Sequence, residues 1–287
     1  MNKQSINAYI EMTKPGILLL VLVTTILGFY LAEAGISHPL LLIWTLIGSG
    51  LSCAGASVLN QYLERNSDAL MNRTKNRPIP SGIISPAQAL GYGIVLILTG
   101  LAMLCWKVNL LTAFLSLLTC FLYVLVYTPM KKMTWLNTTI GAIPGAIPPM
   151  GGWTAATNHL DIGAWVLFFI LFTWQHPHFY AIAWILKEDY KKAGFKMLPV
   201  VYPDGKMTLA QIMAFTFALI GFSIMPTMLG MSGAIYFWGV LALGAGFLYS
   251  AFLFQQNQSL LNARKVLGAS VIYLPLLLAL IIVDVIF

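Results

Sequence analysis

Nine long apolar runs dominate the sequence and constrain its fold more than any other feature. They cover residues 16–35, 41–60, 86–106, 109–128, 137–156, 162–186, 208–230, 233–254 and 267–287. Each run approaches the roughly 20 apolar residues that an α-helix needs to cross a bilayer. The runs are long and continuous rather than short and alternating, which excludes the strands of a membrane β-barrel. We therefore predict an all-α polytopic membrane protein with nine transmembrane helices.

The composition supports this class. Hydrophobic residues make up 59% of the 287 residues and charged residues only 9%, whereas a soluble domain carries about 25% charged residues. The N-terminal segment lacks the pattern of a cleaved signal, so the first run is expected to stay in the mature protein. Because the linkers are short, we expect one membrane-embedded domain over residues 1–287. We expect this domain to contact the lipid bilayer and to bind no nucleic acid.

The basic residues predict the orientation of the helices. Fifteen of the 16 Lys and Arg residues precede the first run or follow the second, fourth, sixth and eighth runs, and Lys107 alone falls on the other side. Cytoplasmic loops of membrane proteins carry an excess of Lys and Arg. We therefore expect the N-terminus and these loops in the cytoplasm and the C-terminus outside, for a protein of the cell inner membrane.

Residues 60–80, NQYLERNSDALMNRTKNRPIP, are unusually polar for this chain. Asn60, Glu64, Asp68 and Asn72 recur every four residues. On a helix, side chains four apart lie on one face, so we predict a stripe of oxygen donors at the cytoplasmic end of the second span. Magnesium is typically held by one or two carboxylates together with substrate phosphates. A solvated loop at the lipid headgroups is the alternative interpretation.

Basic residues follow the stripe directly, at Arg73, Lys75 and Arg77, with Asn76 between them. Cations beside metal-binding carboxylates suit a polyphosphate, because Arg and Lys can bind the oxygens that the metal leaves free. Positive charge at a membrane surface is also a topological signal, so these cations by themselves are weaker evidence for a binding site than the paired acids are.

Two further cytoplasmic segments carry candidate side chains. Glu188 and Asp189 follow the sixth run among several lysines, of which Lys187 is the first, and Lys131 follows the fourth run. Two acidic sites that face one cavity could hold two Mg²⁺ ions on a diphosphate and stabilise the leaving group as its bond breaks.

Two histidines lie within the sixth run, in the segment TWQHPHFYA. An ionisable residue inside a membrane span indicates a functional site, and imidazole can ligate haem iron. His176 and His178 are therefore candidates for haem contact. A buried, hydrogen-bonded core histidine is the alternative for each.

These features resemble the UbiA superfamily of intramembrane prenyltransferases, and within it the protohaem IX farnesyltransferases. In the family's first motif, Asn-Asp-x-x-Asp-x-x-x-Asp, the first, fifth and ninth positions correspond to Asn60, Glu64 and Asp68, and Gln61 replaces the second. The longer segments NRTKNRP, YTPMKK, PHF and DYKKAGFKMLPV are also typical of the farnesyltransferases. The second family motif departs from the pattern, because Ile185 stands four residues before Asp189 where an Asp is usual.

The resemblance implies a nine-helix bundle around a central cavity. It implies transfer of a farnesyl group from farnesyl diphosphate to a vinyl group of haem B, which gives haem O for terminal oxidases, with haem A synthase or the oxidase assembly as a partner. Mg²⁺ would be bound by Glu64, Asp68 and Asp189, supported by Asn60, with His178 favoured over His176 for haem. The expected diphosphate contacts are Arg73, Lys75, Asn76, Arg77, Lys131 and Lys187.

Two other functions are compatible with parts of the sequence. A related prenyltransferase would act on a different ring, such as 4-hydroxybenzoate, and a pocket without haem-binding histidines would favour it. A membrane transporter or cation channel would need charged residues near the middle of several spans. The acids of this chain sit mostly at the span ends, which argues against transport.

Overall fold

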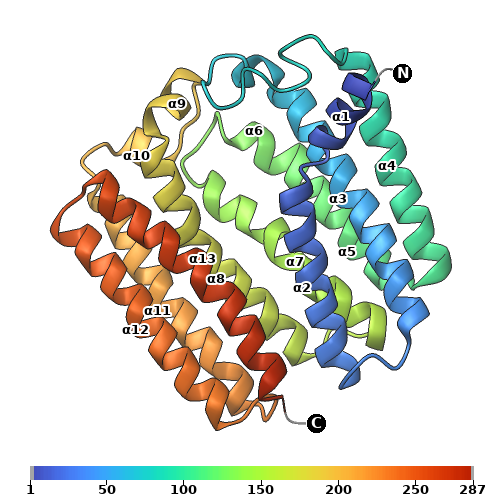
Figure 1. Ribbon diagram of the computed structural model, residues 1–287, viewed down its shortest axis with the longest axis vertical. Coiled ribbons are helices and arrows are strands. Elements are labelled where there is room, and N and C mark those ends of the chain that lie inside the picture. Colours follow the sequence, from blue (N-terminus) through green and yellow to red (C-terminus); the bar gives the residue numbers. More distant parts are fainter. Residues whose placement is uncertain (1–2, 286–287) are drawn as a thin grey trace.

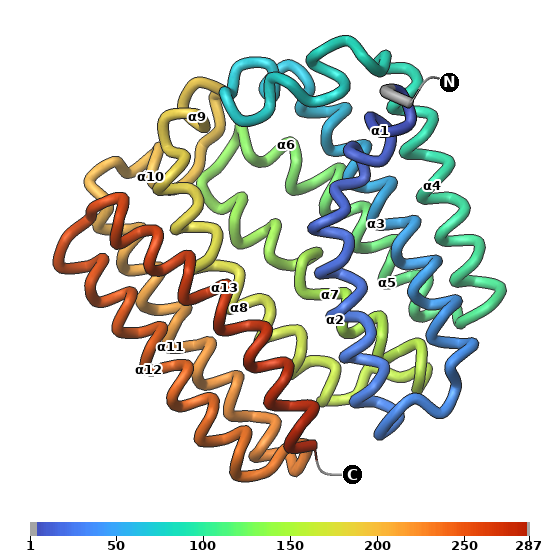
Figure 2. Tube along the Cα trace, in the orientation of Figure 1, coloured from blue at the N-terminus to red at the C-terminus, as the bar shows by residue number. Residues whose placement is uncertain are grey.

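Each of the nine apolar runs corresponds to a long helical segment in a computed structural model, which describes residues 3–285 (Figure 1 and Figure 2). Within those residues the only strand-like pairing is an isolated bridge between Ser232 and Val285. The helices are α1 (Lys3–Met12), α2 (Pro15–Glu33), α3 (Pro39–Asp68), α4 (Pro86–Lys107), α5 (Leu110–Phe121), the π-helical η1 (Leu122–Tyr127), α6 (Thr128–Met130), α7 (Asn137–Thr157), α8 (Ile162–Ile185), α9 (Lys187–Lys192), α10 (Leu198–Val201), α11 (Lys206–Met228), α12 (Ala234–Gln256) and α13 (Leu260–Val283). The prediction of an all-α fold is confirmed.

Seven helical segments in the described part of the chain are long and apolar enough to cross a bilayer, which confirms a multi-pass membrane protein. They are α2, α3, α4, the continuous segment Leu110–Met130, α11, α12 and α13. The two remaining long helices, α7 and α8, carry internal prolines and most of their residues are buried. They pack against each other, and also against α2 and α5 on one side and α11 and α13 on the other. The count of nine spans remains a prediction for these two helices.

The predicted cytoplasmic segments lie together at one end of the bundle. Figure 1 shows α1, the loop between α3 and α4, α6, α9 and α10 at the top of the view. The loops between α2 and α3, between α4 and α5 and between α7 and α8 lie at the opposite end. The pattern of basic and non-basic loops thus predicted correctly which loops share an end of the bundle. The end of α3 and helix α9, which carry the candidate acids, lie at the same end.

Helix α3 extends beyond its apolar run, which ended at residue 60. It continues for two further turns to Asp68, and the chain then turns, with Thr74 Oγ1 donating 2.9 Å to the Asp68 carbonyl oxygen. The first three members of the polar stripe are therefore helical, as predicted. Asn72 was wrongly placed on the same stripe, because it follows the end of the helix and is exposed.

Helices α2 and α7 pack at short range. A Cβ atom at Gly28 would clash with the carbonyl oxygen of Pro149, and one at Gly152 would clash with that of Thr25. Small residues permit this approach between helix backbones in a membrane, where packing rather than water exclusion drives association. Gly152 and Pro149 of α7 thus serve its contact with α2.

A small apolar pocket lies between the two halves of the bundle. Its lining comes from α2, α7, α8, α12 and α13, and includes Leu27, Pro149, Leu171, Leu274 and Leu278. Two of the helices that line this pocket, α8 and α13, carry His178 and Ser270, which contact each other. A third, α2, begins next to Lys14, which contacts Asn60 on α3.

Candidate active site

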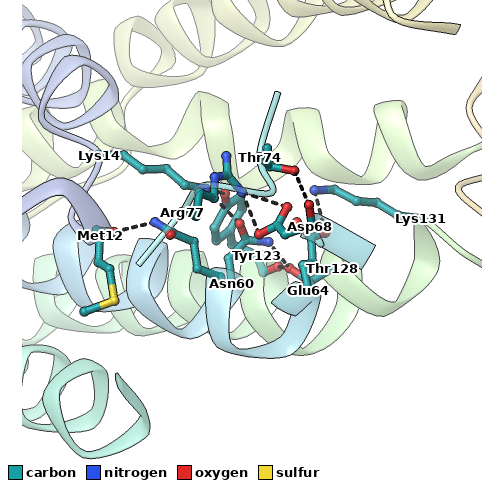
Figure 3. Close-up of polar contacts among 11 residues, drawn as sticks. Met12, Lys14, Asn60, Glu64, Asp68, Thr74, Arg77, Tyr123, Thr128 and Lys131 are labelled. Carbon is teal, nitrogen blue, oxygen red and sulfur yellow. Dashed lines mark hydrogen bonds and ion pairs between the residues drawn. The ribbon is translucent and has the colours of Figure 1, made fainter. Parts of the chain in front are cut away.

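The polar stripe of α3 is buried, although it lies at the end of a membrane helix. Asn60, Glu64 and Asp68 have exposed fractions of 1%, 7% and 0%. Four-residue spacing puts their side chains on the same helix face, and Figure 3 shows them pointing toward a common group of basic side chains. Burying a carboxylate is strongly unfavourable unless it is paired, so the cations around the stripe decide whether this arrangement is stable.

Asp68 is paired with Arg77. One guanidinium nitrogen of Arg77 lies 2.9 Å and 2.8 Å from the two carboxylate oxygens. The turn after α3, closed by the Thr74 hydrogen bond, returns the chain so that this arginine reaches back to the helix end. Arg77 is the one member of the basic run 73–77 that joins the stripe.

Glu64 is paired with Lys131, which follows α6. The Lys131 Nζ lies 2.7 Å from Glu64 Oε1, and it also lies over the rings of Tyr127 and Phe195 at 4.7 Å and 5.6 Å from their centroids. Burial works against the charged ammonium, but the Glu64 carboxylate and the neighbouring Tyr127 and Tyr123 together outweigh this effect and raise the pKa of Lys131 above its ordinary value. The predicted diphosphate ligand Lys131 therefore stays cationic beside the predicted metal ligand.

A third cation, Lys14, was missed by the sequence reasoning. Its Nζ donates a 2.8 Å hydrogen bond to Asn60 Oδ1 and lies 3.5 Å from the hydroxyl of Tyr123, on η1. Burial, reinforced by repulsion from Arg77 and Lys131, lowers the pKa of Lys14 to about 7. No ion pair formed within residues 3–285 includes Lys14. Its sequence signal was a Lys-Pro pair just before the first apolar run, and it was counted only as a topological cation.

The cluster contains three basic groups and two carboxylates, so it carries a surplus positive charge whenever Lys14 is protonated. Lys14, Arg77 and Lys131 surround two carboxylates, and Figure 3 shows Lys14 and Lys131 reaching the stripe from different sides. A surplus cation in a buried, water-poor site favours an anionic ligand, because electrostatic attraction is stronger there than in water. The geometry therefore suits an anion together with a divalent metal.

The remaining predicted diphosphate contacts lie apart from this cluster. The side chains of Arg73, Lys75 and Asn76 are exposed. Lys187 donates 3.2 Å to the Pro203 carbonyl oxygen and lies over the ring of Trp184, 5.3 Å from its centroid. These four residues are at the same end of the bundle, but in this structure they face outward or bind other groups.

Asp189 does not join Glu64 and Asp68 in one metal site. It lies half-buried on the short helix α9, next to the exposed Glu188. Among the residues that the structure describes, no group of three or more His, Cys, Asp or Glu side chains is placed to hold a metal ion. The predicted three-carboxylate ligand set is therefore not assembled as one cluster. Asp189 comes from a different helix, at the same end of the protein as the stripe (Figure 1).

The two histidines of α8 have different environments. His176 is fully buried, its ring is stacked on Phe215 at 3.5 Å, and both ring nitrogens are engaged. Nδ1 lies 2.7 Å from the Phe172 carbonyl oxygen and Nε2 lies 3.2 Å from Thr139 Oγ1. Since a carbonyl oxygen only accepts, Nδ1 carries the proton and Nε2 accepts from the threonine. This is the bonding of a core histidine.

His178 keeps one nitrogen free. It is half-buried, its ring is stacked on Trp174 at 4.7 Å, and its Nδ1 lies 2.8 Å from Ser270 Oγ on α13. In the part of the chain that the structure describes, Nε2 of His178 has no hydrogen-bond partner. Of the two histidines, His178 is therefore the one with a nitrogen available to a ligand.

Comparison with known proteins identifies the family of this fold and site. A sequence profile of the UbiA prenyltransferase family matches residues 21–279, which is most of the chain. The chain belongs to the UbiA prenyltransferase family. It is thus an enzyme that transfers prenyl groups, and the acidic stripe lies on a helix that this family match includes.

Two curated relatives are similar to the chain over nearly their whole length. The chain is 46% identical over 285 residues to a "Protoheme IX farnesyltransferase" of Solibacter usitatus, with 96% of this chain and 98% of that protein covered. It is 43% identical over 276 residues to a protein of the same name from Salinibacter ruber, with the same coverage of 96% and 98%.

Solved UbiA-type structures share the fold. A digeranylgeranylglyceryl phosphate synthase matches with a TM-score of 0.83 at 19% identity, covering 98% of both chains. A UbiA homolog from Archaeoglobus fulgidus, bound to DMAPP and Mg²⁺, matches with a TM-score of 0.71 at 18% identity, covering 96% of this chain and 99% of that one. At identities of 18–19%, these matches show a shared fold, that is, the same arrangement of helices.

Proposed function

We propose that this UbiA-family enzyme transfers a farnesyl group from farnesyl diphosphate to a vinyl group of haem B. The C1–O bond of the farnesyl diphosphate breaks, C1 bonds the terminal vinyl carbon, and a water oxygen adds to the other vinyl carbon. The products are haem O, diphosphate and a proton. The observation that carries the proposal is the 46% identity over nearly the whole chain to a protein named for this activity.

Magnesium fits the oxygen donors of the stripe. Glu64 and Asp68 offer two buried carboxylates one helical turn apart, and the Asn60 amide lies one turn before them. Two carboxylates completed by substrate phosphates are the usual provision for Mg²⁺. Glu64 and Asp68 would hold the ion and Asn60 would support them, whereas Asp189, on α9, lies outside this cluster. When bound, Mg²⁺ supplies positive charge to the phosphate oxygens of the leaving group.

The basic residues are assigned to the diphosphate. Lys131 and Arg77 neutralise the carboxylates, and Lys14 adds a cation that no carboxylate balances. Pre-positioned charge of this kind stabilises the negative charge that develops on a leaving group and costs little reorganisation during the reaction. The outer residues Arg73, Lys75, Asn76 and Lys187 are assigned to the entry path of the diphosphate at the same end of the bundle.

The membrane location protects the reactive intermediate. Ionisation of an allylic diphosphate gives a cation that water would capture. Leu27, Leu171 and Leu274 belong to an apolar pocket between α2, α8 and α13. Apolar walls that exclude water until the vinyl group has reacted prevent this side reaction. The farnesyl chain is assigned to the apolar space between the helices rather than to this pocket, which is too small for it.

His178 is assigned to haem in preference to His176. Its Nε2 is free and its other nitrogen is hydrogen-bonded, which is the arrangement usual for metal-binding histidines. His176 is engaged at both nitrogens and lines the core. The relatives' names do not favour 4-hydroxybenzoate as the acceptor, and family membership does not favour a transporter.

The function is tested with the purified protein. Incubation with haem B, farnesyl diphosphate and Mg²⁺ is expected to give a product with the mass of haem O, and omission of any one component should abolish it. A parallel incubation replaces haem with 4-hydroxybenzoate. Prenylation of that ring without any farnesylated haem would overturn the proposal and favour the other acceptor class.

His178→Ala is expected to weaken haem binding by about tenfold, since a contact worth about 1.4 kcal/mol corresponds to that factor. The Soret band of ferric haem should shift in wild type and not in the variant. Binding of a farnesyl diphosphate analogue with Mg²⁺ should stay near normal, because the polar cluster is built from other helices. If haem titrates identically into both proteins and turnover is unchanged, His178 is only a packing residue.

The loops with the polar cluster are assigned to the cytoplasmic side of the cell inner membrane, where they would meet partners of haem biosynthesis such as haem A synthase or the terminal oxidase assembly. Asn76 and Lys196 are exposed in the loops after α3 and α9, which lie at the basic end, and Ser37 is exposed in the loop between α2 and α3, at the other end. In a background without the three native cysteines, Asn76→Cys and Lys196→Cys should resist a membrane-impermeant thiol reagent in intact cells. Ser37→Cys should react, and the reverse pattern would invert the assignment.

A further inference from the structure

Ser270 on α13 bonds to three groups, two of which belong to the proposed haem side of the site. Its hydroxyl donates 2.6 Å to the Leu267 carbonyl oxygen and lies 2.8 Å from Nδ1 of His178. Its backbone carbonyl oxygen accepts a 2.8 Å hydrogen bond from Nε1 of Trp174. Trp174 is the ring on which His178 is stacked, at 4.7 Å and 21° between planes. Ser270 itself is fully buried.

The positions of the protons follow from these contacts. A serine hydroxyl has one proton to donate and two lone pairs to accept with. Because the Ser270 proton is directed to the Leu267 carbonyl, which can only accept, the hydrogen bond to His178 must run the other way. Nδ1 of His178 therefore carries the proton and donates it to Ser270 Oγ. The neutral ring then has its lone pair on Nε2.

We propose that Ser270 is a positioning residue, which fixes His178 in the Nδ1–H tautomer and aims the unprotonated Nε2 at the haem. The inference rests on the proposed function, because it supposes that His178 contacts haem. It adds a residue that makes no haem contact itself and acts through the histidine. A hydrogen bond to the distal nitrogen of a metal-binding imidazole fixes the tautomer and ring orientation and raises the basicity of the ligand.

The same residue also fixes the plane of the ring. Since the Ser270 carbonyl holds the Trp174 indole, and the indole stacks on the imidazole, rotation of His178 about its side-chain bonds is restricted from two directions. Both contacts come from α13, whereas His178 and Trp174 lie one turn apart on α8. Packing of α13 against α8 is thereby linked to the geometry of the haem site.

The tautomer can be measured without haem. The chain has four histidines, so ¹⁵N-histidine labelling gives few signals, and the His178 signals are those lost in His178→Gln. In wild type, His178 should have a protonated Nδ1 and an unprotonated Nε2. Ser270→Ala should give a mixture of both tautomers, and Ser270→Thr, which keeps a hydroxyl, should retain the wild-type form. Finding Nε2 protonated in wild type would refute the inference even if neither variant folds.

Haem titration then tests the consequence. Ser270→Ala should bind haem B roughly three- to tenfold more weakly, the range that corresponds to one net hydrogen bond. The iron–histidine stretching frequency of the ferrous complex should fall, because the imidazole becomes less basic. Ser270→Thr should restore both values. A residue needed only for packing would change neither the tautomer nor the stretching frequency.

The two possible failures are distinguishable. If His178→Ala weakens haem binding but Ser270→Ala binds haem like wild type with an unchanged iron–histidine frequency, the positioning role is wrong and the haem site stands. If His178→Ala also titrates like wild type, the assignment of haem to this histidine is wrong, and the inference fails with it.

Discussion

Asp68→Asn and Glu64→Gln are each expected to reduce farnesyl transfer by roughly 100-fold or more, the loss seen when one strong transition-state interaction is removed. Both changes keep the shape of the side chain and remove the negative charge that would hold Mg²⁺. Turnover should be measured at saturating and at limiting Mg²⁺, because a weakened metal site shows its largest defect when the metal is scarce.

The controls must separate metal binding from the ion pairs. Each single change leaves a cation unpaired, Arg77 in one variant and Lys131 in the other. An unpaired buried charge can cost about 3–5 kcal/mol of stability. The double variants Asp68→Asn/Arg77→Gln and Glu64→Gln/Lys131→Gln remove both charges of a pair, so thermal stability should recover while turnover stays low.

The opposite pattern would contradict the metal role. If both single variants turn over at near-normal rates with limiting Mg²⁺, the acids are neutralised partners of Arg77 and Lys131 and the loop is only a structured membrane boundary. Recovery of turnover together with stability in the double variants would lead to the same conclusion, because the defect would then come from the unpaired cation.

The helices, and the grouping of their loops at the two ends of the bundle, followed from local properties of the sequence. The length of an apolar run is enough to predict a membrane-spanning helix, and the Lys and Arg content of a loop predicts its side of the membrane, without knowledge of tertiary packing. The least predictable helices are α7 and α8, because prolines, glycines and histidines interrupt their apolar character. Those interruptions reflect contacts between helices, such as Gly28 against Pro149, which no local pattern encodes.

The acidic half of the site was predictable for a similar reason. Spacing by four is a property of one helix, so Asn60, Glu64 and Asp68 could be placed on one face without knowing the fold. The turn that follows was not predictable in this way. Arg73, Lys75 and Arg77 are equivalent in composition, and only the conformation of the turn selects Arg77 as the partner of Asp68.

The basic half depends on contacts between distant segments. Lys131 is 67 positions after Glu64, and Lys14 is 46 positions before Asn60. A lysine next to a membrane span is normally a topological signal, and the sequence holds no mark that separates a binding lysine from a topological one. The same holds for the histidines, which are only two residues apart on α8 but meet different groups from α7, α11 and α13.

Lys14→Met is expected to weaken binding of inorganic diphosphate and to lower kcat/KM for farnesyl diphosphate by about 10- to 100-fold, because a hydrogen bond to a charged group contributes about 1.5–3 kcal/mol. The ammonium lies at Asn60 without a carboxylate partner, and burial lowers its pKa to about 7. An arriving anion relieves this unfavourable state, so the lysine contributes more with ligand bound than in the free enzyme. Diphosphate affinity can be measured calorimetrically in the presence of Mg²⁺.

Lys132→Met is the matched control, because Lys132 is exposed at the same end of the bundle and joins none of the ion pairs in the described chain. It removes the same charge from the same end of the bundle, so it measures how much anion binding weakens when one positive charge is lost without a specific contact. A defect confined to Lys14→Met, partly restored in Lys14→Arg, requires a specific contact at the stripe. Equal diphosphate affinities in Lys14→Met and Lys132→Met would mean that Lys14 only terminates α1 and begins α2. The surplus positive charge of the cluster would then have no part in binding the leaving group.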